Sequence, residues 1–263
     1  MRILCRYIFA VLFFIQAQAK AVDAECSELF ETHKIIPNTD SCLMKCLTVK
    51  IDMKTFICHD QCEAYCKGPC ENILSEIRKK IKNNSPAKWP LKEKFFQWST
   101  TEKQNVTTAV TKIPGILVNT EKFEIYRMDK SENFPNPGTS GDSDPRTIVL
   151  YTTAFNGKYN LERVLAHEFA HIYYQKMSAN LKESYNLKMN WFLADPKKER
   201  WISRKDGFVE EDGRISPEED FANNLEYYLF DLQKLKTVTS NAFDWIQSNI
   251  GDLKMKPGCK YEK

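Results

Sequence analysis

Two histidines and one glutamate in the stretch LERVLAHEFAHIY (161–173) have the types and spacing of a metal site. They are His167, Glu168 and His171, in the pattern HExxH. On a helix, residues four apart share one face, so both imidazoles would point at one place. Two imidazoles so placed suit Zn²⁺, and the glutamate can act as general base on a water bound to the metal. Chance is a poor explanation, because the chain has only four histidines.

The element that must carry this motif is a helix. Its apolar residues recur at helical spacing, and Asn160 is a suitable N-cap. The apolar positions are Leu161, Val164, Leu165, Phe169, Ile172 and Tyr173. The alternative interpretation is a core helix whose two histidines happen to fall four residues apart.

A catalytic zinc site needs a third protein ligand and keeps one position for water. Residues 216–232 (SPEEDFANNLEYYLFDL) predict a second helix, with Ser216 as N-cap and Pro217 in its first turn. Glu219 is either the third ligand or the capping-box partner of Ser216. The apolar stripe expected for this helix consists of Phe221, Leu225, Tyr228, Leu229 and Leu232.

Two strands are expected before the HExxH helix, at 122–128 (KFEIYRM) and 147–152 (TIVLYT). The segment 133–146 between them is rich in Pro, Gly, Ser and Asp, which predicts a connecting loop. A helix is expected at 91–113, ending before Pro114. A sheet edge followed by a metal-binding helix would let an extended substrate pair with the exposed strand and lie across the metal.

The first 19 residues have the pattern of a cleavable signal peptide. Arg2 and Arg6 precede an apolar run that is too short to span a bilayer well, and Ala-Gln-Ala follows at 17–19. We therefore expect a secreted or periplasmic protein without a stable membrane anchor. Cleavage would lower the net charge from +3 to +1, which argues against non-specific binding to nucleic acid.

Eight cysteines remain after cleavage, and an even count in an exported chain predicts four disulfides. Many are four residues apart, which would place them on one helical stripe. Two antiparallel helices joined to each other by disulfides would fit this spacing, although the pairing of the cysteines cannot be deduced from the sequence. A second metal site that includes His59 is the alternative. The eight are Cys26, Cys42, Cys46, Cys58, Cys62, Cys66, Cys70 and Cys259.

These observations predict three parts in the mature chain. Residues 20–85 form a small cysteine-rich helical module, and 86–252 form the domain with the HExxH helix. The tail, 253–263, is expected to be tied back by Cys259. An amphipathic, basic helix at 71–84 ends the first module at Ser85-Pro86.

The stretch DGFVEEDGRISPEEDFANNLEYYL (206–229) resembles the second metal helix of lethal-factor-like zinc metallopeptidases. Their motif reads like F-V-S-x-Y-(A/G)-x-x-(S/T)-P-x-E-D-F-A-E, and the resemblance covers roughly 115–250. It implies an α+β, zincin-like domain that hydrolyses peptide bonds of a peptide or protein substrate. It also implies one Zn²⁺ on His167, His171 and Glu219, with Glu168 as general base. Asn223, one turn after Glu219, sits where a side chain would orient a ligand histidine.

The sequence departs from that motif at Asp212, where the family usually has a tyrosine. The tyrosine hydroxyl can stabilise the oxyanion of the tetrahedral intermediate, whereas an ionised carboxylate would repel it. Losing one oxyanion donor typically costs about 10²–10³ in rate. Arg214, Tyr227 or Tyr228 are candidates to replace it, and Asp212 could also lie away from the site.

Two other interpretations therefore stay open. The chain could be a zinc-binding protein with weak or no activity, whose cysteine-rich module binds a partner. It could also be a purely structural protein with disulfides and helices and no metal.

Overall fold

The computed structural model describes most of the chain beyond residue 72. The chain divides into two compact units, Met1–Ser75 with Pro257–Glu262, and Glu76–Lys256 with Lys263. The predicted signal peptide and the eight cysteines beyond it lie outside the described residues, so the cysteine-rich module, its disulfides and the tie through Cys259 stay predictions. The described residues are 73–86, 93–118, 122–131, 135–141, 145–197, 200–251, 253 and 255.

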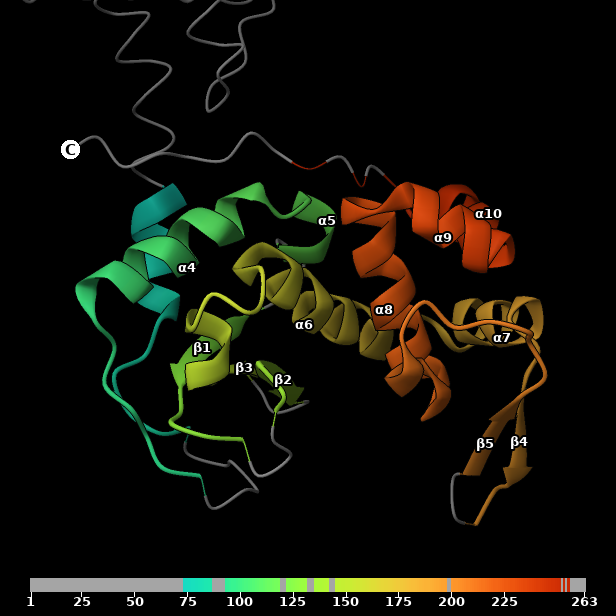
Figure 1. The fold of residues 1–263 in the computed structure, drawn as a ribbon, viewed down its shortest axis with the longest axis horizontal. Helices are drawn as coiled ribbons and strands as arrows, with labels where there is room; N and C mark the ends of the chain where they lie inside the picture. The colour runs from blue at the N-terminus through green and yellow to red at the C-terminus, as the bar shows by residue number, and fades with distance from the viewer. Residues whose placement is uncertain are drawn as a thin grey trace, which may run out of the picture. The chain divides into compact units, whose positions relative to one another are not determined.

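The second unit is α+β, with helices packed around a small mixed sheet (Figure 1). The sheet has the order β1-β3-β2, from β1 (Phe123–Arg127), β2 (Gly138–Gly141) and β3 (Arg146–Leu150). Strands β1 and β3 are parallel, and β2 pairs antiparallel with β3 at the edge. The expected strands at 122–128 and 147–152 are thus confirmed. The expected loop at 133–146 is wrong in part, because it contains β2.

Strand β3 is the centre of this sheet, and its residues Ile148, Val149 and Leu150 are fully buried. Edge strand β2 lies close to the HExxH helix because it begins with a glycine. A Cβ added to Gly138 would lie 2.8 Å from Glu168 Oε1 and 3.1 Å from the side chain of Val164. A larger residue here would require the side chains of Glu168 and Val164 to shift, so glycine favours this close approach of the sheet edge to the general-base candidate.

The HExxH motif lies on α6 (Leu161–Lys176), which lies beside edge strand β2 and packs against α8 (Figure 1). The expected cap is confirmed, since the Asn160 side chain accepts from the backbone N–H of Glu162 and of Arg163. The 3₁₀ turn η1 (Thr152–Phe155) joins β3 to α6. On the buried side of α6, Phe169 packs edge-on against Phe123 of β1, with ring centroids 5.0 Å apart. The helix is therefore fixed on the sheet by its apolar side.

The predicted second helix is confirmed as α8 (Pro217–Phe230), which carries Ser216 as N-cap. Phe221 and Leu225 are fully buried, as expected for its apolar stripe. The stripe does not reach Leu232, which is 39% exposed. The helix stops at Asp231, whose side chain caps the next helix, α9 (Leu232–Val238).

The segments before the sheet differ from expectation at their ends. The helix expected at 91–113 begins only at Thr100 in α4 (Thr100–Lys112), because Ser99 forms a capping box with Glu102. It ends before Pro114, as expected, and α5 (Gly115–Val118) follows. The helix expected at 71–84 ends at residue 80. The compact unit begins at Glu76 rather than near 86, since Ile77 and Ile81 belong to its core.

Several further elements were not predicted from the sequence. Besides α5 and α9, they are α7 (Ala179–Lys188), the hairpin of β4 (Trp191–Asp195) with β5 (Arg200–Ser203), and α10 (Ser240–Asn249). Aromatic and β-branched residues on both sides of Asp195-Pro196 were a usable hairpin signal. Within the described residues, no helix combines the length and apolar character needed to cross a membrane.

Candidate metal centre

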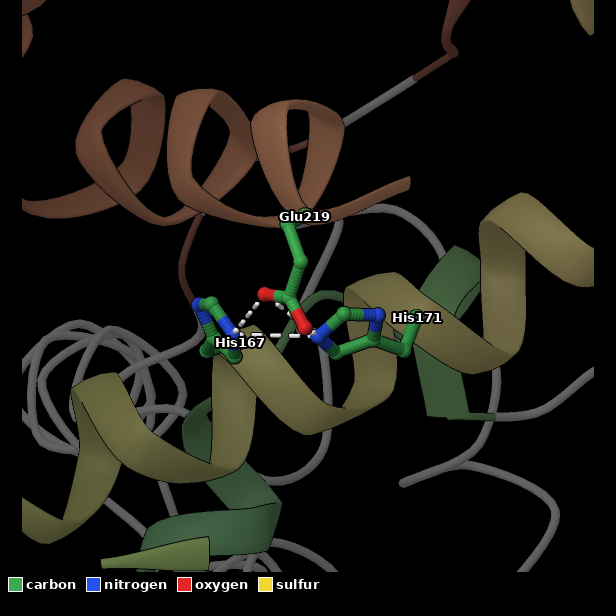
Figure 2. A group of neighbouring side chains, drawn as sticks. All are labelled: His167, His171 and Glu219. Atoms are coloured by element: carbon green, nitrogen blue, oxygen red, sulfur yellow. Dashed lines mark hydrogen bonds and ion pairs between the residues drawn. The ribbon is translucent and has the colours of Figure 1, made fainter. Parts of the chain in front are cut away.

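Two elements far apart in the sequence bring together three side chains that could hold a metal ion (Figure 2). His167 and His171 project from α6, and Glu219 projects from the first turn of α8. The two histidine Nε2 atoms are 3.0 Å apart. Glu219 Oε2 lies 3.6 Å from Nε2 of His167 and 3.4 Å from Nε2 of His171. The three predicted ligands therefore point at one place.

The spacing of these atoms fits a small tetrahedral ion. Ligands about 2.0–2.1 Å from a tetrahedral zinc lie about 3.3 Å from one another. The three observed separations, from 3.0 to 3.6 Å, bracket that value. Ser216 Oγ accepts from the backbone N–H of Glu219 at 3.1 Å, while the Glu219 carboxylate faces the histidines. Glu219 thus takes part in the N-cap through its backbone and leaves its side chain free to bind a metal.

Glu168, the predicted general base, lies beside this group and is 4% exposed. Its Oε2 atom is buried and has no hydrogen-bond partner among the described residues. Burial raises the pKa of Glu168, although His167, His171 and a hydrogen bond with Ser140 favour the charged form. A buried, unsatisfied carboxylate oxygen normally indicates a missing partner.

The charges around the histidines favour a cation at this place. Burial disfavours the protonated form of His171, but its hydrogen bonds to Glu218 and Glu219 raise its pKa to about 9. The pKa of His167 is also raised, because hydrogen bonds to Glu219 and Glu226 outweigh its burial. The same histidines lower the pKa of Glu219 despite its burial. The same carboxylates that favour a proton on these rings would also favour a metal cation between them.

The outer nitrogens of both histidines face carboxylates that sequence reasoning missed. His171 Nδ1 lies 3.2 Å from Glu218 Oε1, and His167 Nδ1 lies 3.4 Å from Glu226 Oε2. Both glutamates were visible in the sequence of α8. Which side chains of α6 they face depends on how α6 and α8 cross, so no local sequence pattern indicated their role.

The role expected for Asn223 is not what the structure shows. Its side-chain amide donates to Asp212 Oδ1 at 2.6 Å instead of to a ligand histidine. Asp212 lies on the exposed 3₁₀ turn η2 (Glu211–Arg214), which packs against α8. The buried Asn223 therefore fixes Asp212, while Glu218 and Glu226 face the histidines.

The candidates to replace the missing tyrosine are engaged elsewhere. Arg214 Nε donates to Glu211 at 2.8 Å, and the guanidinium lies over the ring of Phe208. The Tyr227 hydroxyl donates to Glu210 and accepts from Lys234. Tyr228 stacks on Phe243, with ring centroids 5.7 Å apart.

Behind the ligand glutamate, the completely buried Asp220 anchors α8. It accepts hydrogen bonds from Tyr185 of α7 and from Trp191 of β4, each at 3.0 Å. Asn224 also donates to it, at 3.0 Å, and Lys205 forms a buried ion pair with it. Because Asp220 follows Glu219 directly, this network fixes the helix turn that carries the third candidate ligand.

Comparison with known proteins identified no relative of this chain. No protein-family model matches the chain, and a search of curated proteins gave no match.

Proposed function

We propose that this chain is an exported zinc-dependent metalloendopeptidase with a zincin-like domain, similar to the lethal-factor-like group. One observation carries the proposal, which is the convergence of His167, His171 and Glu219 from two helices beside a buried Glu168. Three protein ligands with room for a fourth are typical of catalytic zinc sites, whereas structural zinc sites are closed by four. Export is supported only by the signal-peptide pattern at 1–19.

The residues of the chain have distinct tasks in this proposal. When bound, zinc supplies a Lewis acid that polarises the scissile carbonyl and makes a water more acidic. Glu168 takes the proton from the attacking water through its unsatisfied Oε2 and later gives it to the leaving amine. Burial raises the pKa of Glu168, which suits a group that must both accept and return a proton.

Edge strand β2 is the proposed site for the substrate backbone. Within the described sheet it pairs on one side only, with β3, and its first residue lies against Glu168. An extended peptide can add to such an edge through main-chain hydrogen bonds. This pairing would hold a peptide bond near the general base without requiring a particular side chain.

The substitution Glu168→Gln tests the proposal. It preserves size and leaves the three ligands untouched, but an amide cannot accept the proton from water. Zinc content should stay unchanged, while cleavage of a peptide library should fall by at least about 10²-fold. A chelator should abolish peptide cleavage by the parent protein in the same assay. Equal cleavage by Glu168→Gln and parent would place the chemistry elsewhere.

A second candidate function is a zinc-binding protein with weak or no peptidase activity, whose cysteine-rich module binds a partner. Asp212 at the expected tyrosine position favours it, as do the other partners of Arg214, Tyr227 and Tyr228. If the parent protein binds zinc but hydrolyses no peptide of the library, this second function is favoured.

A further inference from the structure

We infer that Glu226 and Glu218 are positioning residues, each of which fixes the ring of one ligand histidine so that its Nε2 faces the metal. The inference rests on the proposed zinc site and adds two residues that its ligand set does not include. It is carried by contacts of the outer ring nitrogens, which the three ligands alone leave unexplained.

The first contact holds His167. Its Nδ1 lies 3.4 Å from Glu226 Oε2, and the Glu226 side chain is only 15% exposed. The other carboxylate oxygen, Oε1, accepts from Arg163 Nε at 2.6 Å. Arg163 is held in turn by the ring of Tyr227, 4.6 Å away. Glu226 is therefore fixed from one side by a cation and faces the imidazole with its other oxygen.

The second contact holds His171 in a matching way. Its Nδ1 lies 3.2 Å from Glu218 Oε1, which also accepts from Gln175 Nε2 at 3.0 Å. The side-chain oxygen Oε1 of Gln175 accepts a hydrogen bond from Arg146, at the start of β3, at 3.0 Å. The chain of contacts thus runs from the histidine to the sheet.

The two contacts follow one rule of helix geometry. Arg163, His167, His171 and Gln175 are spaced by four and share one face of α6. Each histidine therefore has a neighbour one turn away that fixes its carboxylate, Arg163 for His167 and Gln175 for His171. Glu218 and Glu226 are about two helical turns apart on α8. Glu219, next to Glu218, faces Nε2 of both histidines.

This arrangement determines the tautomer of both rings. A carboxylate at Nδ1 accepts a proton from that nitrogen, which leaves Nε2 unprotonated and able to bind a metal. Removing such a partner typically costs about 10–100-fold in metal affinity. Glu226 should contribute more than Glu218, because the Glu218 side chain is 33% exposed and its charge is better screened.

The test compares zinc dissociation constants of the full chain for Glu226→Ala, Glu226→Gln and Glu218→Ala, measured by competition with a chelator. Glu226→Ala should weaken zinc binding about 10–100-fold and Glu218→Ala less. Glu226→Gln keeps an acceptor oxygen and the side-chain volume, so it should recover most of the affinity. In NMR spectra of the zinc-loaded protein, the His167 Nδ1–H signal should be present in the parent and in Glu226→Gln, and lost in Glu226→Ala.

Glu211→Ala is the matched control, because it removes an exposed carboxylate of η2 that pairs with Arg214. It should leave the dissociation constant within about twofold, as expected for a screened surface charge. An unchanged constant and an unchanged Nδ1–H signal in Glu226→Ala would overturn the positioning role while the zinc site stands. The zinc site itself would be contradicted by a different result, which is zinc binding by Glu219→Ala as tight as that of the parent.

Discussion

Asp212 occupies the position where the lethal-factor-like motif usually has a tyrosine, so it bears on the rate of the proposed enzyme. Its carboxylate is held by the Asn223 amide at 2.6 Å, so it has a defined place on η2. A tyrosine at this position would offer a hydroxyl donor without charge at neutral pH, whereas an aspartate is shorter and normally ionised.

Asp212→Tyr should therefore raise kcat/KM for peptide hydrolysis by about 10-fold or more, because one oxyanion donor usually contributes at least that much. Asp212→Asn removes the charge without adding reach, so it should raise kcat/KM less. Steady-state kinetics on one library-derived peptide would measure both. If both variants are slower than the parent, Asp212 has a positive role, and the correspondence with the family tyrosine is wrong.

Individual site residues were predictable to different degrees. His167, Glu168 and His171 were predictable because their spacing is a local property of one helix. Glu219 followed from the resemblance of its own helix, which also carries a recognisable N-cap. Glu218 and Glu226 were not predicted, since their role is created by the crossing of α6 and α8.

Among the elements, α8 is held by an unusually polar interior contact. Asp220 is completely buried and pairs with Lys205, and hydrogen bonds from Tyr185 and Trp191 complete its surroundings. A buried ion pair adds little net stability, but removing one partner leaves an uncompensated charge.

Asp220→Ala should lower the free energy of unfolding of the metal-free protein by about 3–5 kcal/mol. The reason is that it leaves the Lys205 ammonium without its counter-charge and several hydrogen-bond donors without an acceptor. Asp220→Asn keeps an acceptor and should cost less. Denaturant unfolding followed by circular dichroism would measure both, with the exposed Glu183→Ala of α7 as control, expected within about 0.5 kcal/mol of the parent. A loss below about 1 kcal/mol in Asp220→Ala would show that the network does not anchor α8.

The long periodic elements were predictable from sequence and the irregular ones were not. Helices α6 and α8 and strand β3 have apolar patterns that require burial. Strand β2 has the sequence Gly-Thr-Ser-Gly, which lacks any strand signal. It is a strand because β3 offers a free edge and because Gly138 can approach Glu168. Pairing with β3 and contact with Glu168 depend on tertiary structure, so no local sequence pattern predicts them.

At the scale of the whole molecule, the described part is the second compact unit, which contains the complete candidate metal centre. The eight cysteines belong to the rest of the chain, where the predicted disulfides await a test. Under non-reducing conditions the chain cleaved after residue 19, as predicted, should have no free thiol, because eight cysteines pair completely. Thiol titration after denaturation, with a reduced sample as control, measures this. Eight titratable thiols with bound metal would favour the second metal site instead.

The zinc content of purified parent protein and of Glu219→Ala tests the central claim most directly. Three protein ligands converge at one place, so the parent should contain about one zinc per chain. Glu219→Ala removes the only one of the three that α8 contributes, and it should lose most of that zinc, while Glu219→Asp should keep some. Full zinc occupancy in Glu219→Ala, or none in the parent, would contradict the proposed metal centre.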